Sequence, residues 1–374
     1  MSGIYIHIPF CKQACHYCDF HFSTSLKSKK AFLDSLKKEI ELQKGYLESE
    51  RIETLYFGGG TPSIMEKEDF EDILVQLKNH FSFSKDFEFT IEANPDDLDE
   101  ETLKSLKKIG GNRLSIGIQS FNDKYLKFFN RAHNSTLAES CIPLARSIGF
   151  DNISMDLIFG SPNQSIEELE TDLQKSIGMT PDHISIYGLT IEEKTVFGNW
   201  HKKGKITPLE EEIAAKQFEL ILERLGESGY EQYEISNFSK PGFESRHNSS
   251  YWSGKKYLGL GPSAHSFNGQ SRQYNVPNNA QYIRALQNSK IPSTVEILSL
   301  LDQTNDTILT RMRTSAGLDT NWLLSKFDIN LMEEKESEIS QFIGQGMLEN
   351  KQGVLTLTPA GKLLADLIIE KLII

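Results

Sequence analysis

The chain has 374 residues, of which 38% are hydrophobic and 25% charged, and this composition excludes a disordered chain or a coiled coil. Its 52 Asp and Glu outnumber its 40 Lys and Arg, so the formal net charge is −12 and nucleic acid is not an expected partner. Apolar runs such as 363–369 are shorter than the roughly 20 residues that span a bilayer, and the N-terminus shows no signal-peptide pattern. We therefore expect a soluble, cytoplasmic globular protein.

The first half of the chain repeats a strand-like run followed by an amphipathic helix-like run. Six strands are predicted, at residues 4–9, 52–57, 88–93, 113–119, 152–159 and 183–189. Helical patterns lie between them, at residues 30–47, 66–80, 99–109, 136–148 and 165–177. Asp99 and Ser165 are the expected N-cap residues of the third and fifth of these helices. The alternation predicts six parallel β/α units, hence an α/β fold.

Unusual residues cluster where these strands end. Gly58–Gly60, Glu92, Gln119 and Asp156 all lie at or just beyond the end of a predicted strand. Parallel units can close into a barrel or spread into an open sheet, and barrel enzymes place their chemistry at this end of the strands. The pattern favours an incomplete (β/α)6 TIM-like barrel over residues 1–195, with an open side for a large substrate.

The remaining residues form two further segments in this interpretation. Residues 196–297 begin with a long helix at 209–225 and continue as a region rich in Gly, Ser and aromatic residues, 229–279, which we expect to be a connecting, lid-like loop. Residues 298–374 contain short helical patterns and a small hairpin, which predict a winged-helix-like α+β domain. From residue 301 onward seven Lys and Arg face eleven Asp and Glu, so a protein-facing or structural role is favoured over DNA binding.

Three of the four cysteines lie within eight residues. Cys11, Cys15 and Cys18 have the spacing C-x3-C-x2-C, which in a reducing compartment indicates metal binding rather than disulfide bonds. Zinc would need a fourth ligand, for which three histidines are near in the sequence: His7, His16 and His21. A [4Fe–4S] cluster held by three thiolates leaves one iron open for a ligand. The spacing and the loop position favour the cluster over zinc.

The cysteine motif, with Tyr17 directly before its last cysteine, resembles the signature of the radical S-adenosylmethionine (SAM) enzymes. Further blocks are similar, in the same order, to those of the anaerobic coproporphyrinogen oxidases and of their paralogues, the HemW family of heme chaperones: Tyr5-Ile-His-Ile-Pro-Phe-Cys, Gly58-Gly-Gly-Thr-Pro, Ile91-Glu-Ala-Asn-Pro, Ser115-Ile-Gly-Ile-Gln-Ser-Phe and Asp156-Leu-Ile. The resemblance implies a [4Fe–4S] cluster on the three cysteines, with SAM chelating its open iron.

The resemblance also implies which residues contact SAM: Tyr5, Tyr17, Gly59, Gly60, Thr61, Glu92, Gln119, Arg131 and Asp156. The residue types fit this role. Glycines let the backbone approach a small charged ligand closely, and carboxylates at a barrel mouth can accept hydrogen bonds from an amine or from ribose hydroxyls. Taken singly, each carboxylate would more often be a surface acid, and Arg131 a solvated helix end.

Two features separate the heme chaperones from the oxidases. The oxidases carry a further cysteine two positions after the third and an N-terminal extension, whereas here Phe20 occupies that position and the first cysteine is already residue 11. The run from His247 to Trp252, His-Asn-Ser-Ser-Tyr-Trp, resembles the H-N-x-x-Y-W motif of the chaperones. It implies heme binding through His247, with Tyr251 and Trp252 against the porphyrin. His265 is a reserve ligand, and a structural loop histidine packed by aromatic residues is the alternative.

The sequence is thus interpreted as a heme chaperone that carries a [4Fe–4S] cluster and SAM and delivers heme to acceptor hemoproteins. The alternatives are an oxygen-independent coproporphyrinogen III oxidase and a zinc-stabilised β/α protein. No residue is assigned a catalytic role, and whether the protein is an enzyme stays open. Membrane association of the acceptor and formation of a homodimer are also left open.

Overall fold

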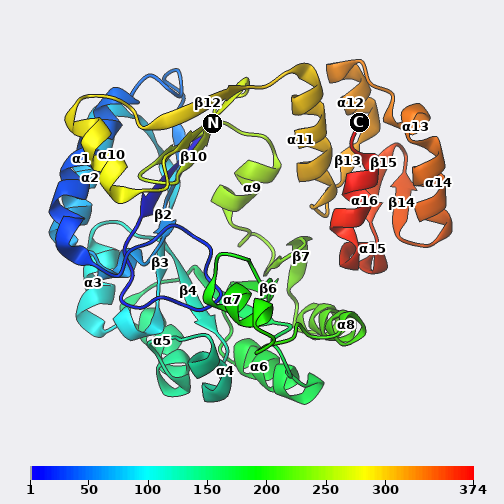
Figure 1. The fold of residues 1–374 in the computed structure, drawn as a ribbon, viewed down its shortest axis with the longest axis horizontal. Helices are drawn as coiled ribbons and strands as arrows, with labels where there is room; N and C mark the ends of the chain where they lie inside the picture. Colours follow the sequence, from blue (N-terminus) through cyan, green and yellow to red (C-terminus); the bar gives the residue numbers. More distant parts are fainter. Residues whose placement is uncertain (1) are drawn as a thin grey trace.

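The computed structural model describes residues 2–374, which fold around one large mixed sheet (Figure 1). Its order is β12-β11-β10-β9-β1-β2-β3-β4-β5-β6-β8-β7. The first six strands pair in parallel, in chain order. They are β1 (Ser2–Ile8), β2 (Ile52–Gly59), β3 (Phe83–Ala93), β4 (Arg113–Gln119), β5 (Ile153–Phe159) and β6 (His183–Gly188). The six predicted units and the incomplete barrel are therefore confirmed.

Helices connect these strands and cover the outside of the sheet. They are α1 (Lys29–Leu42), α2 (Lys67–His80), α3 (Glu100–Lys108), α4 (Asp123–Phe128), α5 (Ser135–Ile148) and α6 (Ile166–Gly178), with 3-10 turns at Leu26–Ser28, Pro62–Ile64 and Pro95–Asp97. Both predicted caps are present, because the Asp99 side chain accepts from the Thr102 N–H and the Ser165 side chain accepts from the Glu168 N–H. Among residues 2–374, no helix is long and apolar enough to cross a membrane.

The prediction of a lid-like loop over 229–279 is wrong, because much of this region consists of strands that extend the sheet. The elements are α7 (Val196–Lys202), α8 (Glu211–Glu227), β7 (Glu231–Glu234), β8 (Asn237–Ser239), α9 (Arg246–Trp252), β9 (Tyr257–Leu260), β10 (His265–Phe267), β11 (Ser271–Asn275), α10 (Asn279–Gln287) and β12 (Ser293–Ile297). Strand β9 pairs in parallel with β1, and β8 pairs antiparallel with β6. Strands of three to five residues are too short to show a clear alternating pattern.

Residues from Leu300 onward form a smaller helical unit with its own hydrophobic core, beside the main sheet in orange and red in Figure 1. It comprises α11 (Leu300–Met312), β13 (Leu318–Asp319), α12 (Thr320–Phe327), α13 (Leu331–Glu334), α14 (Glu336–Gly344), β14 (Leu348–Lys351), β15 (Val354–Leu357), α15 (Pro359–Leu363) and α16 (Ala365–Leu372). A three-stranded sheet of order β13-β15-β14 forms its wing. The helices and the hairpin agree with the winged-helix-like prediction.

A buried carboxylate joins the first helix to the sheet extension. Glu39 on α1 is 0% exposed and accepts hydrogen bonds from the Gly261 N–H (2.8 Å), the Tyr282 hydroxyl (2.6 Å) and the Asn275 side-chain amide (2.6 Å). All three partners follow β9 in the chain, more than 200 residues after Glu39. This cluster therefore holds the C-terminal side of the sheet against α1.

We expect Glu39→Gln to lower the free energy of unfolding by about 1–3 kcal/mol, because the new amide group turns a donor toward donors in a buried site. Urea denaturation followed by circular dichroism would measure the loss. Glu41→Gln is the matched control, since Glu41 lies on the same helix in an exposed pair with Lys38 and should leave the midpoint unchanged. Equal midpoints for the two variants would contradict the role given to Glu39.

Candidate cluster and cofactor site

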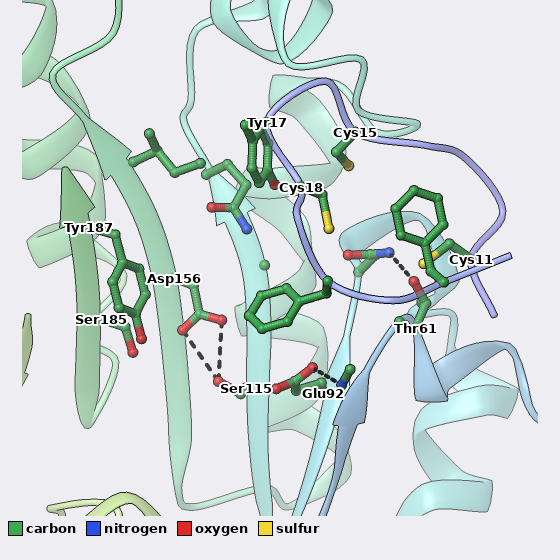
Figure 2. A pocket seen from close by; sticks show the side chains of 18 of the residues that line it. Cys11, Cys15, Tyr17, Cys18, Thr61, Glu92, Ser115, Asp156, Ser185 and Tyr187 are labelled. Carbon is green, nitrogen blue, oxygen red and sulfur yellow. Dashed lines mark hydrogen bonds between the residues drawn. The ribbon is translucent and has the colours of Figure 1, made fainter. Parts of the chain in front are cut away.

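A cavity of about 560 Å³ opens at the carboxyl ends of the parallel strands (Figure 2). Its wall combines the loop after β1 with residues from β2 to β6, among them Glu92, Ser115, Asp156 and Tyr187. The carboxyl ends of parallel strands meet at one edge of a barrel, which brings these distant residues together. The cavity is therefore the site at which the sequence motifs converge.

The cysteines lie on a loop that leaves β1 and returns at Ser23, whose N–H donates to the Pro9 carbonyl. The loop is held from outside the barrel strands. The Asn130 side-chain amide donates to the Ala14 carbonyl (2.7 Å), His16 Nδ1 lies 2.9 Å from the Phe128 carbonyl, and Lys12 forms ion pairs with Asp96 and Asp97. These contacts position a loop that has little regular secondary structure of its own.

All three cysteines are free thiols and line the cavity. Burial raises the pKa of Cys11 to about 11 and that of Cys18 to about 12, so both side chains are protonated thiols at neutral pH. Because metal ligands must be thiolates, loading this site releases protons. The Arg131 Nη1 atom lies 3.4 Å from Cys15 Sγ and supplies positive charge beside the loop.

The three neighbouring histidines are engaged elsewhere. His7 Nε2 lies 2.7 Å from the His21 carbonyl, His16 Nδ1 contacts Phe128, and His21 Nε2 lies 2.7 Å from Asn279 Oδ1. Among residues 2–374, no group of His, Cys, Asp or Glu side chains is preformed to hold a single metal ion, and this includes the three cysteines. The arrangement does not form the Cys3His zinc site considered from the sequence. Three thiols around the rim of a larger cavity fit a [4Fe–4S] cluster with one open iron.

The glycine at position 117 shows how closely the site is built. A Cβ atom there would lie 2.9 Å from Gln119 Nε2 and 3.2 Å from Arg131 Nη2. The missing side chain lets Arg131 reach the β4 backbone, where its Nη2 donates to the Gly117 carbonyl (2.6 Å) and to Asn94 Oδ1 (2.6 Å). Its Nη1 contacts the Tyr17 hydroxyl at 3.4 Å. Arg131 thus ties the cysteine loop to β4 and to Asn94, the residue that follows β3, rather than lying as a solvated helix end.

Two carboxylates lie below the cysteine loop (Figure 2). Glu92 accepts from the Tyr56 hydroxyl (2.8 Å) and from the Gly59 N–H (3.1 Å), and burial raises its pKa to about 7. The two oxygens of Asp156 accept from the Ser115 hydroxyl, both at 3.3 Å, and burial also raises the pKa of Asp156. These side chains provide hydrogen-bond acceptors for an amine or for ribose hydroxyls inside the cavity.

The structure brings together all but one of the residues that the resemblance assigns to SAM. Those lining the cavity are Tyr17, Gly59, Gly60, Thr61, Glu92, Gln119, Arg131 and Asp156. Tyr5 is not among the lining residues. Its hydroxyl lies 3.1 Å from His7 Nδ1, and its ring packs against Tyr56, so it supports the wall from behind.

Several lining residues were not predicted from the sequence. They are Tyr56, Asn94, Arg113, Ser115, Gly117, Ser185, Tyr187 and Asn248, together with residues of the cysteine loop. The strand pattern could have indicated some of them, because alternate residues of a strand face the same side of a sheet. Arg113, Ser115 and Gly117 lie at alternate positions that lead to Gln119, which was predicted. Asn248, which comes from α9, is the second residue of the His-Asn-Ser-Ser-Tyr-Trp run, but that motif did not place it at this cavity.

His247 lies on helix α9 and not in a loop, so that part of the prediction is wrong. The helix packs against β1, β2 and α11. The imidazole is 1% exposed, with Nδ1 2.7 Å from Thr54 Oγ1 and Nε2 2.8 Å from the Tyr251 hydroxyl. Burial lowers its pKa to about 3, so the ring is neutral. In this conformation both ring nitrogens are engaged, as in the structural alternative considered from the sequence.

The other two motif residues face a separate cleft. Tyr251 and Trp252 line a space of about 250 Å³ between the sheet extension and the C-terminal unit. Its wall is mainly aromatic and charged, with further contributions from Tyr257, Phe267, Arg272, Asp306, Arg311, Trp322, Lys326 and Phe327. Asp306 forms an ion pair with Arg272. The predicted porphyrin contacts therefore do not share one surface with the His247 ring.

Three thiols on one loop, facing a cavity at the mouth of a six-unit barrel, define a radical SAM protein. Residues 5–175 match the model of the radical SAM superfamily, and residues 298–364 match the HemN C-terminal domain. The chain is 35% identical to the heme chaperone HemW of Bacillus subtilis, covering 98% of this chain and 97% of that one. It is 32% identical to the HemW of Lactococcus lactis, covering 100% and 97%. The chain belongs to the HemW family.

A solved structure supports the fold. Coproporphyrinogen III oxidase HemN from Escherichia coli, a radical SAM enzyme, superposes with a TM-score of 0.85 at 23% identity, covering 100% of this chain and 90% of that one. At this level of identity the similarity describes the fold alone. It places the mixed sheet and the C-terminal unit in one known architecture.

Proposed function

We propose that this protein is a cytoplasmic heme chaperone that carries a [4Fe–4S] cluster and SAM and delivers heme to acceptor hemoproteins. The observation that carries the proposal is the end-to-end similarity to proteins named heme chaperone HemW, with 35% identity over 98% of the chain. The free thiols of the cavity suit a reducing compartment. The proposal leaves the identity of the acceptor open.

In this proposal Cys11, Cys15 and Cys18 hold the cluster. When bound, the cluster supplies one-electron chemistry and an open iron for SAM. Glu92 and Asp156 accept hydrogen bonds from the amino and ribose groups of SAM. Gly59 and Gly60 keep side chains out of the space beside the loop, where their backbone can approach the ligand.

The oxidase alternative receives support from the HemN fold, and Phe20 argues against it. This side chain is 70% exposed and lines the cavity at the position where the oxidases carry their additional cysteine. We expect the anaerobically reconstituted protein to bind heme, to pass it to an apo-hemoprotein, and to convert no coproporphyrinogen III. Parallel heme-transfer and turnover assays would measure both. Turnover above background under reducing conditions would replace the chaperone proposal with the enzyme.

For the heme ligand we propose His247, with Tyr251 and Trp252 contacting the porphyrin from the aromatic cleft. Because both nitrogens of His247 are hydrogen-bonded, ligation requires the ring to leave Thr54 and Tyr251. A change in the position of α9 would therefore precede or accompany heme binding.

We expect His247→Ala to weaken heme binding by about 10-fold or more and to shift the Soret band. Even the loss of a contact that only supports a metal ligand weakens metal binding by about 10-fold. Tyr251→Phe should instead speed heme association by about fivefold, because it removes one hydrogen bond of ~1 kcal/mol that holds Nε2. Stopped-flow and equilibrium heme titrations would measure both effects. If His265→Ala loses the heme spectrum while His247→Ala keeps it, the exposed His265 is the ligand and His247 is structural.

A further inference from the structure

One wall of the cavity contains a buried cation whose side-chain N–H groups have no hydrogen-bond partner among residues 2–374. Arg113 is the first residue of β4, is 1% exposed and lines the cavity. Its Nε atom is buried without a hydrogen-bond partner, and its guanidinium forms no hydrogen bond or ion pair with any of residues 2–374. Arg131 differs, since its two terminal nitrogens have four partners. Buried donors without a hydrogen-bond partner are costly, so the guanidinium N–H groups of Arg113 call for an explanation.

The carboxylates of the same cavity offset the charge of Arg113 through space, since that charge opposes the rise in the pKa of Glu92 and of Asp156, but they do not accept its hydrogen bonds. Asp156 is held by Ser115, and Glu92 by Tyr56 and the Gly59 N–H, so each has donors of its own. Neither forms an ion pair with Arg113. The guanidinium is therefore left to face the open space of the cavity.

The strand direction places Arg113 away from the cysteines. It lies six residues before Gln119, which at the rise of an extended strand corresponds to about 20 Å along β4. The cysteine loop lies near Gln119, as the contacts of Arg131 with Cys15 and Gly117 show. A carboxylate bound beside the cysteines would lie at the opposite end of the cavity from Arg113. A carboxylate bound by Arg113 would therefore be a different chemical group from the one beside the cysteines.

We propose that Arg113 binds a carboxylate of a ligand that enters this cavity. The planar guanidinium matches a carboxylate through two parallel hydrogen bonds, and a buried setting strengthens such a pair. Two ligands of the proposed function carry this group, heme through its propionates and SAM through its α-carboxylate. The position far from the cysteines favours a propionate of heme, and this part of the inference rests on the proposed function.

The test measures the binding affinity of each ligand that carries a free carboxylate and of a counterpart that lacks it. The proteins compared are wild type, Arg113→Gln and Arg113→Lys. Heme is paired with heme dimethyl ester, and SAM with decarboxylated SAM. We expect wild type to bind heme about tenfold or more tightly than the ester, Arg113→Gln to bind the two equally, and Arg113→Lys to keep part of the preference. Arg146→Gln is the control, because Arg146 pairs with Asp182 outside the cavity and should keep the full preference.

A loss of preference confined to the SAM pair would support the same carboxylate site with SAM as its source. The inference is overturned if Arg113→Gln retains the wild-type preference in both pairs, or if it weakens acids and counterparts equally, which would mark a structural role. A wild-type protein that binds no heme would refute the proposed function, while the SAM pair would still test Arg113.

Discussion

Replacing Cys11, Cys15 or Cys18 with alanine is expected to abolish cluster assembly. Each variant should lose the visible iron–sulfur absorption, the reduced-state EPR signal and nearly all bound iron after anaerobic reconstitution. The reason is geometric, because the three thiols share one loop at the cavity, and each histidine beside them already has a ring nitrogen hydrogen-bonded elsewhere. Metal analysis combined with EPR would measure the effect.

Cys141→Ala is the matched control for these variants. Cys141 is a buried free thiol on α5, and its Sγ lies 3.3 Å from the Ala138 carbonyl. It should retain wild-type iron content and spectra. Stoichiometric zinc without iron in the reconstituted wild-type protein would contradict the cluster assignment and would revive the zinc-stabilised alternative.

Arg131→Ala is expected to weaken SAM binding by about 2–5 kcal/mol, a loss of about 30-fold or more, as removal of one partner from a buried charged contact does. Arg131 joins the cysteine loop to β4 and to Asn94, so its loss also frees the surface against which SAM would rest. The measurement is a titration of the cluster EPR signal with SAM. Iron content should stay near wild type, because all three thiols remain.

Arg146→Ala serves as the control for a lost arginine on the same barrel, since its partner Asp182 lies outside the cavity. It should leave the SAM titration unchanged. A wild-type titration curve for Arg131→Ala would show that Arg131 only braces the loop. The same fall in affinity for Arg146→Ala would point to general destabilisation.

The sequence alone determined the barrel and the location of its chemistry. Each β/α unit is encoded by residues close together in the chain, which is why the six strands and the caps at Asp99 and Ser165 were predicted with small errors at their ends. The cysteine motif lies on one short loop, and strand ends bring Glu92, Gln119 and Asp156 to the same edge. Local patterns and the geometry of parallel strands suffice for such features.

Only the tertiary structure decided where the later segments lie and what they contact. Strand β9 becomes a strand through pairing with β1, more than 250 residues earlier, which no local pattern records. His247 looks like a ligand in the sequence, yet Thr54 and Tyr251 occupy both of its ring nitrogens. Arg113 looks like an ordinary strand residue, yet the fold buries it and leaves its Nε atom without a hydrogen-bond partner. Burial and hydrogen bonding of these side chains depend on residues that are distant in the chain, and folding alone brings those residues into contact.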